Sequence, residues 1–160
     1  MADDTIVERF CAFLRGRKLA VTSQRLAIAE LMLHARDHLS AEDVAGRIQE
    51  QGHTVGLATV YRTIDLLVES KLLVERDFGE GFRRFEPARD VPQHEHMLCT
   101  VCGAVEEFHD ERIIAITKAV AQSRGFASDR HRLVIHGTCR ACQRAATATA
   151  TATTTDRSTA

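Results

Sequence analysis

The sequence predicts an α+β fold built from two lobes. Between residues 5 and 68, apolar side chains recur at helical spacing, whereas residues 72–86 alternate polar and apolar side chains as strands do. A strand, helix, strand pattern then lies between two Cys-x-x-Cys pairs, Cys99/Cys102 and Cys139/Cys142. A helical lobe that ends in a hairpin is therefore followed by a small α/β lobe with cysteines at both ends.

Composition limits the class of protein. A chain of 160 residues with 44% hydrophobic residues can bury one moderate core or two small lobes. The first residues lack the basic and apolar regions of a secretory signal, and no apolar run reaches membrane-spanning length, so we expect a cytoplasmic protein. Reducing conditions there leave thiols available for metal. The net charge is −1, so any affinity for DNA must come from a local basic stripe.

Helical periodicity defines the first lobe. The expected helices cover residues 5–15, 22–34, 41–51 and 57–68. Thr22 and Ser40 are good N-cap residues for the second and third of them. Strands at 72–76 and 82–86 follow around a glycine-containing turn. Helices followed by such a hairpin are typical of a winged helix-turn-helix over residues 1–86, a pattern that also occurs outside DNA-binding proteins.

The fourth predicted helix has two different faces. Its apolar face is formed by Leu57, Val60, Ile64 and Leu67, and its opposite face near the N-terminus by Ala58, Thr59, Arg62 and Thr63, with Tyr61 at the boundary. Small residues, a hydroxyl, an aromatic ring and an arginine suit a helix whose first turns enter a major groove. Taken alone, Tyr61 is more simply explained by half-buried packing.

Basic residues gather where the second helix begins, at Arg17, Lys18 and Arg25. The backbone N–H groups of a helix start already favour an anion. Solvated charges are the simplest interpretation of this cluster, and contacts with DNA phosphates are the alternative.

The cysteine pairs indicate a metal site. Cys99, Cys102, Cys139 and Cys142 supply the four thiolates of a closed tetrahedral Zn²⁺ site. Their long spacer predicts a small subdomain between the pairs. A redox dithiol or a disulfide is the alternative for either pair taken alone.

A second group of possible ligands directly precedes the first cysteine pair. On a strand, His94 and His96 project from one face and Glu95 from the other. All the paired thiols are already used, so the histidines indicate a second site that is richer in nitrogen and oxygen ligands and open to exchange. Two solvent-exposed histidines beside a zinc knuckle are the alternative.

The remaining boundaries follow from composition. Residues 87–93 contain Pro87 and Pro92 and are expected to be a hinge linker, and residues 94–144 form the metal-binding lobe. Residues 145–160 are an Ala/Thr repeat without hydrophobic periodicity, for which we expect a disordered tail.

The order of these parts resembles the ferric uptake regulator family of metal-sensing bacterial repressors. The matching segments are Val21–Arg25, His38–Asp43, Gly56–Thr63 and His94–Phe108, and the resemblance covers about residues 8–142. It implies a homodimer in which the C-terminal lobes pair and the two winged helices straddle a palindromic DNA operator.

The resemblance also implies roles for particular residues. The regulatory metal site would comprise His38, Glu86, His94, His96 and Glu107. Tyr61 and Arg62 match the base and phosphate contacts of the recognition helix. The basic residue that the family often carries two positions before Thr22 is Ala20 here, with Lys18 or Arg17 as substitutes. Gln93 and Ile114 depart from the ligands of a further family site that would include Glu95 and His131, so we expect that site to be weak or missing.

Imidazole and carboxylate ligands suit Fe²⁺, Mn²⁺, Co²⁺ or Zn²⁺ alike. Within the resemblance, the zinc-sensing branch commonly has a cysteine near Glu86, and the peroxide-sensing branch favours aspartates where this chain has Glu86 and Glu107. Both comparisons favour iron-responsive repression, with peroxide or zinc sensing as alternatives.

Two other classes provide rival functions. A zinc hydrolase or deaminase needs an open coordination position and a general base, and a deaminase has His-x-Glu and a proline before its Cys-x-x-Cys. Here Glu95 directly follows His94 and Leu98 precedes Cys99, so we expect no enzyme. The other rival is a zinc-stapled interaction module that does not bind DNA.

Overall fold

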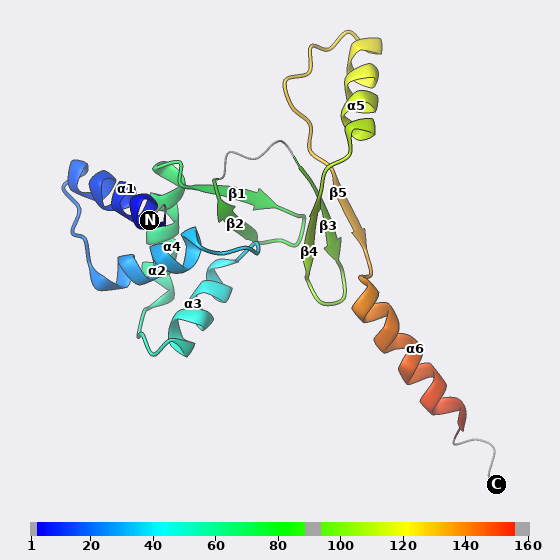
Figure 1. The fold of residues 1–160 in the computed structure, drawn as a ribbon, viewed down its shortest axis with the longest axis horizontal. Helices are drawn as coiled ribbons and strands as arrows, with labels where there is room; N and C mark the ends of the chain where they lie inside the picture. Colours follow the sequence, from blue (N-terminus) through cyan, green and yellow to red (C-terminus); the bar gives the residue numbers. More distant parts are fainter. Residues whose placement is uncertain (1–2, 89–93, 156–160) are drawn as a thin grey trace. The chain divides into compact units, whose positions relative to one another are not determined.

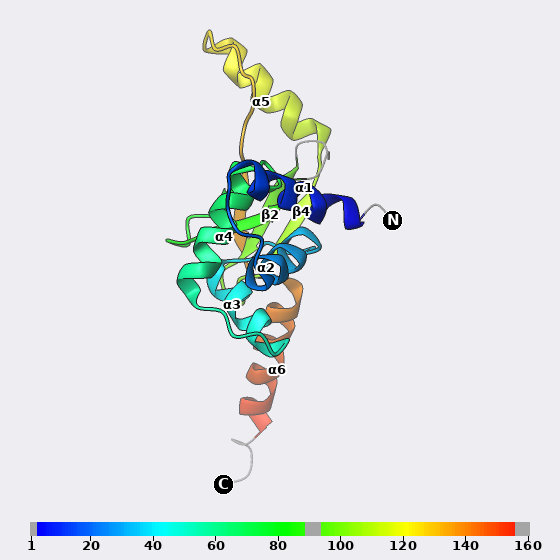
Figure 2. The ribbon, with the colours of Figure 1, turned by 90° about the vertical axis from the view of Figure 1, so that its left-hand side faces the viewer.

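The computed structural model describes residues 3–88 and 94–155, with backbone only at 3–4 and 149–155 (Figure 1). The chain divides into two units, Met1–Asp90 and Val91–Ala160. Of the predicted linker 87–93, residues 89–93 lie outside the described part. The first unit contains α1 (Asp3–Gly16), α2 (Ser23–Leu33), α3 (Ala41–Glu50), α4 (Leu57–Glu69), β1 (Leu73–Asp77) and β2 (Arg83–Pro87). Figure 2 turns these helices toward the viewer.

The predicted caps start the helices of the first unit. The side chain of Thr22 accepts a hydrogen bond from the backbone N–H of Arg25. Ser40 and Asp43 form a capping box at α3, in which each side chain bonds the backbone N–H of the other. Because these bonds satisfy N–H groups that the helix itself leaves unpaired, both helices begin where the sequence predicts.

The core of the first unit lies between its helices and the hairpin. Its fully buried large side chains come from every helix and from β2, and they include Phe10, Leu14, Ile28, Met32, Val44, Ile48, Val60, Ile64, Leu67 and Phe85. Two expectations for α4 are wrong: Leu57 is 41% exposed, and Thr63 is fully buried. Leu57 is the first residue of its helix and extends beyond the core. The Thr63 hydroxyl can enter the core because it donates to the Thr59 carbonyl at 2.7 Å.

The hairpin is antiparallel, with Leu73 opposite Pro87 and Asp77 opposite Arg83. The strand β2 therefore includes Pro87, which the sequence analysis assigns to the linker, and Ala88 also donates to the Leu72 carbonyl at 2.9 Å. The pairing extends one residue further than expected because Pro87 lies at the end of β2, where a missing N–H is tolerated.

The segment before α3 joins the same sheet. Leu39 and Phe85 exchange backbone hydrogen bonds of 3.0 and 2.8 Å in an isolated antiparallel bridge. Arg84 also donates to the His38 carbonyl at 3.2 Å. These contacts fix the backbone of His38 beside β2.

The second unit contains β3 (Glu95–Cys99), β4 (Val105–Phe108), α5 (Glu111–Ser123), β5 (Val134–Gly137) and α6 (Arg140–Thr155). Its three-stranded sheet has the order β4-β3-β5, in which β3 is antiparallel to β4 and parallel to β5. The predicted strand, helix, strand arrangement is therefore present. Figures 1 and 2 both show α5 beyond one end of this sheet and α6 beyond the other.

The sequence analysis expects a disordered tail over residues 145–160, where the structure has part of a helix. The helix α6 continues through the Ala/Thr repeat to Thr155, and residues 156–160 lie outside the described part. Alanine has the highest helix propensity, and the Thr147 hydroxyl donates to the Gln143 carbonyl at 2.7 Å. A lack of hydrophobic periodicity thus did not exclude a helix. Within the described ranges, every helix is too short or too polar to cross a bilayer.

Candidate metal centres and DNA-facing helix

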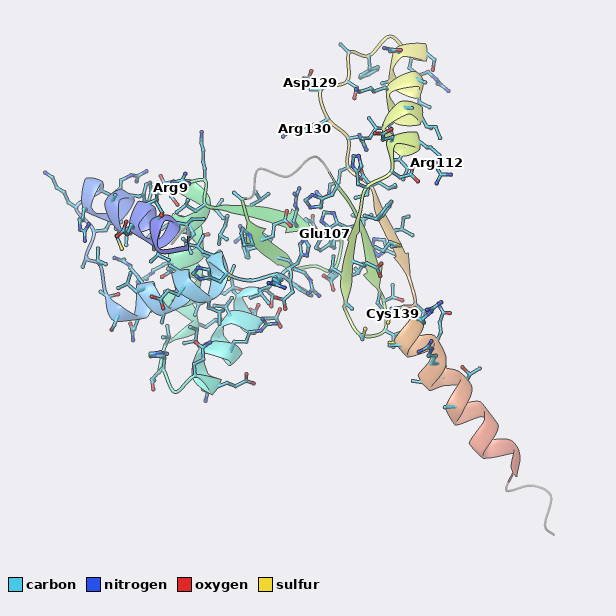
Figure 3. The ribbon with its side chains drawn as sticks, in the orientation of Figure 1. Arg9, Glu107, Arg112, Asp129, Arg130 and Cys139 are labelled. Atoms are coloured by element: carbon cyan, nitrogen blue, oxygen red, sulfur yellow. The ribbon has the colours of Figure 1, made fainter. Side chains whose placement is uncertain are left out.

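The two cysteine pairs meet at one end of the three-stranded sheet. Because Cys99 lies opposite Gly137 on the parallel strand β5, the loop after β3 and the start of α6 share this end. Figure 3 shows Cys139 where β5 leads into α6. Gly103 ends the turn that carries Cys99 and Cys102, and it has a φ of +71°. Its backbone N–H donates to the Cys99 carbonyl at 2.9 Å.

The distances between the sulfur atoms match a tetrahedral metal site. All four Sγ atoms lie within 4.8 Å of one another, with 3.9 Å from Cys99 to Cys142 and 3.8 Å from Cys102 to Cys139. A tetrahedron with Zn–S bonds of about 2.3 Å has edges of about 3.8 Å. The residues therefore fit Zn²⁺, and a closed set of four thiolates leaves no coordination position for a reacting water.

The electrostatics of this cluster differ between its members. Backbone N–H groups, first that of Cys139 and then those of Cys102 and Val101, lower the pKa of Cys99 to about 6. Hydrogen bonding with Cys139 and Cys102 raises the pKa of Cys142 to about 12. Four adjacent thiolates repel one another without a cation, so loading with metal must release protons.

One group of possible ligands belongs to the first unit. His38 precedes the bridge to β2, and its buried Nε2 lies 2.7 Å from Oε2 of the buried Glu86. The ring of His38 also packs edge-on against Phe78, with centroids 5.4 Å apart. Burial raises the pKa of the Glu86 carboxyl, but the bond from His38 and the charge and bonds of Arg76 outweigh it and lower the pKa to about 2.

A further group belongs to the second unit. Glu107, labelled in Figure 3, lies on β4 opposite His96 on β3. Its Oε1 is 3.9 Å from Nε2 of His94. The rings of His94 and His96 have centroids 4.9 Å apart. His94 and His96 therefore lie close together, as the alternation predicts, and Glu107 from β4 lies beside them.

Glu95 faces the other side of the sheet, also as predicted. Its carboxylate accepts hydrogen bonds from the backbone N–H of Leu133 at 3.2 Å and lies 2.7 Å from Nε2 of His131. Of the other two positions of the further family site, Ile114 offers an apolar side chain and Gln93 lies outside the described residues. Glu95 and His131, the two polar members of this further family site, therefore contact each other.

The candidate DNA-facing residues lie at the start of α4 and around α2. Arg62 is exposed and Thr59 is half-buried. The Tyr61 hydroxyl donates to Glu42 at 2.8 Å, which raises the pKa of Tyr61. Lys18 is exposed at a φ of +57°, and Arg25 donates to the Ala20 carbonyl at 2.5 Å.

Sequence reasoning missed Arg76, which contacts Glu86 through two nitrogens. The sequence predicts the strand that carries Arg76, but its pairing with Glu86 depends on the register between β1 and β2. Opposite charges at diagonal positions of the hairpin are the available sequence signal.

The helices and wing of the first unit, together with the cysteine centre of the second, define a metal-binding winged-helix regulator of transcription. The chain belongs to the ferric uptake regulator family, whose model matches residues 16–136. It is 34% identical over 139 residues to the Ferric uptake regulation protein of Bacillus subtilis (strain 168), covering 85% of this chain and 93% of that protein.

Solved structures give the same assignment. The ferric uptake regulator from Francisella tularensis with iron has a TM-score of 0.70 and 28% identity, covering 78% of this chain and 95% of that one. The ferric uptake regulator from Pseudomonas aeruginosa with manganese has a TM-score of 0.58 and 37% identity, covering 79% and 95%. The predicted fold class is therefore confirmed.

Proposed function

We propose that this protein is an Fe²⁺-dependent repressor of iron-homeostasis genes, which binds a palindromic operator as a cytoplasmic homodimer. The observation that carries the proposal is that each unit holds imidazole and carboxylate side chains close together. The first unit offers His38 and Glu86, and the second offers His94, His96 and Glu107. Regulatory function and not catalysis is expected, as in the family.

The two groups would act together as the regulatory site. Each holds nitrogen and oxygen ligand atoms at close range, which suits an exchangeable divalent ion better than the closed cysteine centre does. Bound by both groups, the ion would join the DNA-binding unit to the second unit and favour one arrangement of the two. Removal of the ion would release that constraint.

Iron is proposed over the other metals for two reasons. The curated relatives are named ferric uptake regulation proteins, and a solved relative is described with iron. The ligand set also has glutamates at positions 86 and 107 and no cysteine near Glu86. Manganese in the Pseudomonas aeruginosa structure shows that a relative takes a second metal. Peroxide sensing and zinc sensing remain the alternative functions within the family.

DNA recognition is proposed for the first turns of α4. Tyr61, Thr59 and Arg62 would face the major groove, and Arg25 and Lys18 would contact phosphates. Arg62 and Lys18 are exposed and the other three are half-buried, which supports this assignment. The bond from Tyr61 to Glu42 would have to open before the hydroxyl could reach a base.

Dimerisation is proposed for the second unit. Large apolar side chains of α5 and the following loop are exposed, with Ile116 at 62%, Val120 at 57% and Phe126 at 72%. The helix α5 buries none of its own residues within the single chain. A second copy would cover this apolar surface and place two winged helices on a symmetric operator.

The deciding experiment combines metal analysis with DNA binding. Protein purified without chelator should contain about one zinc per chain. Its fluorescence anisotropy with an operator duplex, measured anaerobically, should rise on addition of Fe²⁺ and fall again with a ferrous chelator. DNA binding that ignored Fe²⁺ and followed Zn²⁺ would place the protein among zinc sensors. Loss of binding after peroxide, with one oxygen added to a histidine peptide, would indicate a peroxide sensor.

A further inference from the structure

Arg76 on β1 makes an asymmetric contact with Glu86. Its Nε and Nη2 atoms both reach the same carboxylate oxygen, Oε1, at 2.6 and 2.5 Å. The other oxygen, Oε2, lies 2.7 Å from Nε2 of His38. Each oxygen of this buried carboxylate thus has a different neighbour, an arginine on one side and an imidazole on the other.

The hairpin register produces this arrangement. Glu86 lies opposite Val74, so Arg76 is its diagonal neighbour on the same face of the two-stranded sheet. From that position the planar guanidinium can direct two donors at one oxygen. Because Glu86 is only 7% exposed, little water is available to replace those bonds.

We propose that Arg76 is a positioning residue of the regulatory metal site, which holds Glu86 by Oε1 and leaves Oε2 as the single oxygen for the metal. The inference rests on the proposed function, because it assigns Glu86 to that site. The proposal goes beyond the list of ligands. It states that Glu86 binds through one oxygen, and it therefore affects the coordination number of the metal.

The geometry favours positioning over competition. The two atoms that would ligate, Nε2 of His38 and Oε2 of Glu86, already face each other away from the guanidinium bonds. A metal taken up by these two atoms displaces no bond of Arg76. Bidentate binding by Glu86 would instead require Oε1, which already accepts two N–H groups.

The arginine also brings a positive charge close to the proposed cation. Like charges repel, and this repulsion between the guanidinium and a divalent ion acts over several ångströms. Solvent at the partly exposed guanidinium weakens it. We therefore expect Arg76 to weaken metal binding while it fixes the geometry, and these two effects can be separated by mutation.

The test titrates Co²⁺ into zinc-containing full-length protein and records the d–d absorption bands, which report coordination number and geometry. Absence of thiolate-to-Co²⁺ charge-transfer bands shows that zinc stays in the cysteine centre. The variants are Arg76→Gln, which removes charge and donors, and Arg76→Lys, which keeps the charge but loses the two-donor fork. Arg83→Gln is the matched control, because Arg83 pairs with Glu75 at 3.0 Å on the same hairpin.

We expect the d–d bands of both Arg76 variants to differ from wild type, because Glu86 can then bind through both oxygens. Affinity for Co²⁺ should rise about tenfold in Arg76→Gln alone, since only that variant loses the charge. The control should keep the wild-type bands and affinity. Wild-type bands in Arg76→Lys or Arg76→Gln would overturn the proposal.

A failure of the proposed function gives a different result. Wild-type protein would then bind no Co²⁺ outside the cysteine centre, or Glu86→Gln would leave the d–d bands unchanged. Circular dichroism and zinc content show whether each variant is folded. A loss of Co²⁺ binding that is caused by unfolding can then be distinguished from a loss of the site. If neither Arg76 variant folds, Arg76 is a structural residue of the hairpin and the positioning role is rejected.

Discussion

Single residues in this protein divide into those that hold the fold and those that would sense metal. The cysteine cluster brings four sulfur atoms within 4.8 Å, and no other group in the described part of the second unit ties the end of β3 to α6 in this way. His94 and Glu107 lie at 3.9 Å in the same unit. Substitutions at these two places should therefore have different consequences.

Replacement of a cluster cysteine should cost stability. We expect Cys99→Ser to lose zinc and to lower the free energy of unfolding by at least 3 kcal/mol, because structural zinc contributes its binding energy to folding. Zinc content and thermal unfolding measure this. Cys11→Ser is the matched control, since Cys11 is half-buried in α1 and should cost less than about 1.5 kcal/mol. Equal losses in both variants would argue against a zinc cluster.

Replacement of a proposed sensing ligand should spare the fold. We expect His94→Ala to remain a zinc-containing protein whose affinity for operator no longer responds to Fe²⁺, because the proposed site loses one imidazole. Anaerobic anisotropy titrations measure the response. The control His136→Ala removes an exposed histidine of β5 and should respond as wild type does. A normal response in His94→Ala would remove this histidine from the site.

Acid should reveal the buried Glu86. The pKa of its carboxyl falls from 4.5 to about 2 in the folded protein, so the stabilisation is fully present above pH 4.5 and is lost as the pH falls toward 2. The shift corresponds to about 3 kcal/mol. We expect the difference in unfolding free energy between wild type and Glu86→Gln to shrink across this window. A difference that stayed constant from pH 5 to pH 2.5 would contradict the ionised, paired carboxylate.

At the level of elements, local hydrogen bonds fix where the helices begin. The capping box of Ser40 and Asp43 starts α3 directly after the bridge that holds His38 beside β2. We expect Ser40→Ala to lower the free energy of unfolding by about 1 kcal/mol, measured by urea denaturation. Ser23→Ala changes an exposed residue next to an intact cap and should cost a few tenths of that amount.

The predictable elements are those with strong periodicity and clear caps. The helices of the first unit show the 3.6-residue spacing, and Thr22 and Ser40 mark two of their starts. Spacing alone could not tell that Leu57 extends past the core or that α6 continues through the Ala/Thr repeat. The exposure of Leu57 depends on how the rest of the unit packs against α4. The length of α6 depends on the helix propensity of alanine and not on burial.

The candidate sites were predictable to different degrees. Cysteine spacing and the alternation of His94, Glu95 and His96 identify ligands because those patterns are local. The partners of Glu86 could not be identified in this way. His38 reaches it through an isolated bridge between segments far apart in the sequence. Arg76 reaches it across a hairpin whose register the sequence pattern does not determine.

At the scale of the whole molecule, the exposed apolar surface of α5 predicts self-association. We expect Val120→Glu to shift the protein from dimer to monomer and to weaken operator binding at least tenfold, because a charge would enter the buried interface. Analytical ultracentrifugation and anisotropy measure the two effects. Phe82→Glu, which adds a charge at the exposed wing of the first unit, should remain dimeric. A dimeric Val120→Glu would place the interface elsewhere.

The strand β3 carries residues of the cysteine cluster and of the proposed regulatory site a short distance apart. His96 faces Glu107 near one end of it, and Cys99 enters the zinc cluster at the other, about 10 Å away. Loss of zinc would free the end of β3 from α6 and disturb the histidines that the same strand carries. A cell deprived of zinc would then lose control of its iron genes even when iron is plentiful, so that supply of one nutrient limits the response to another.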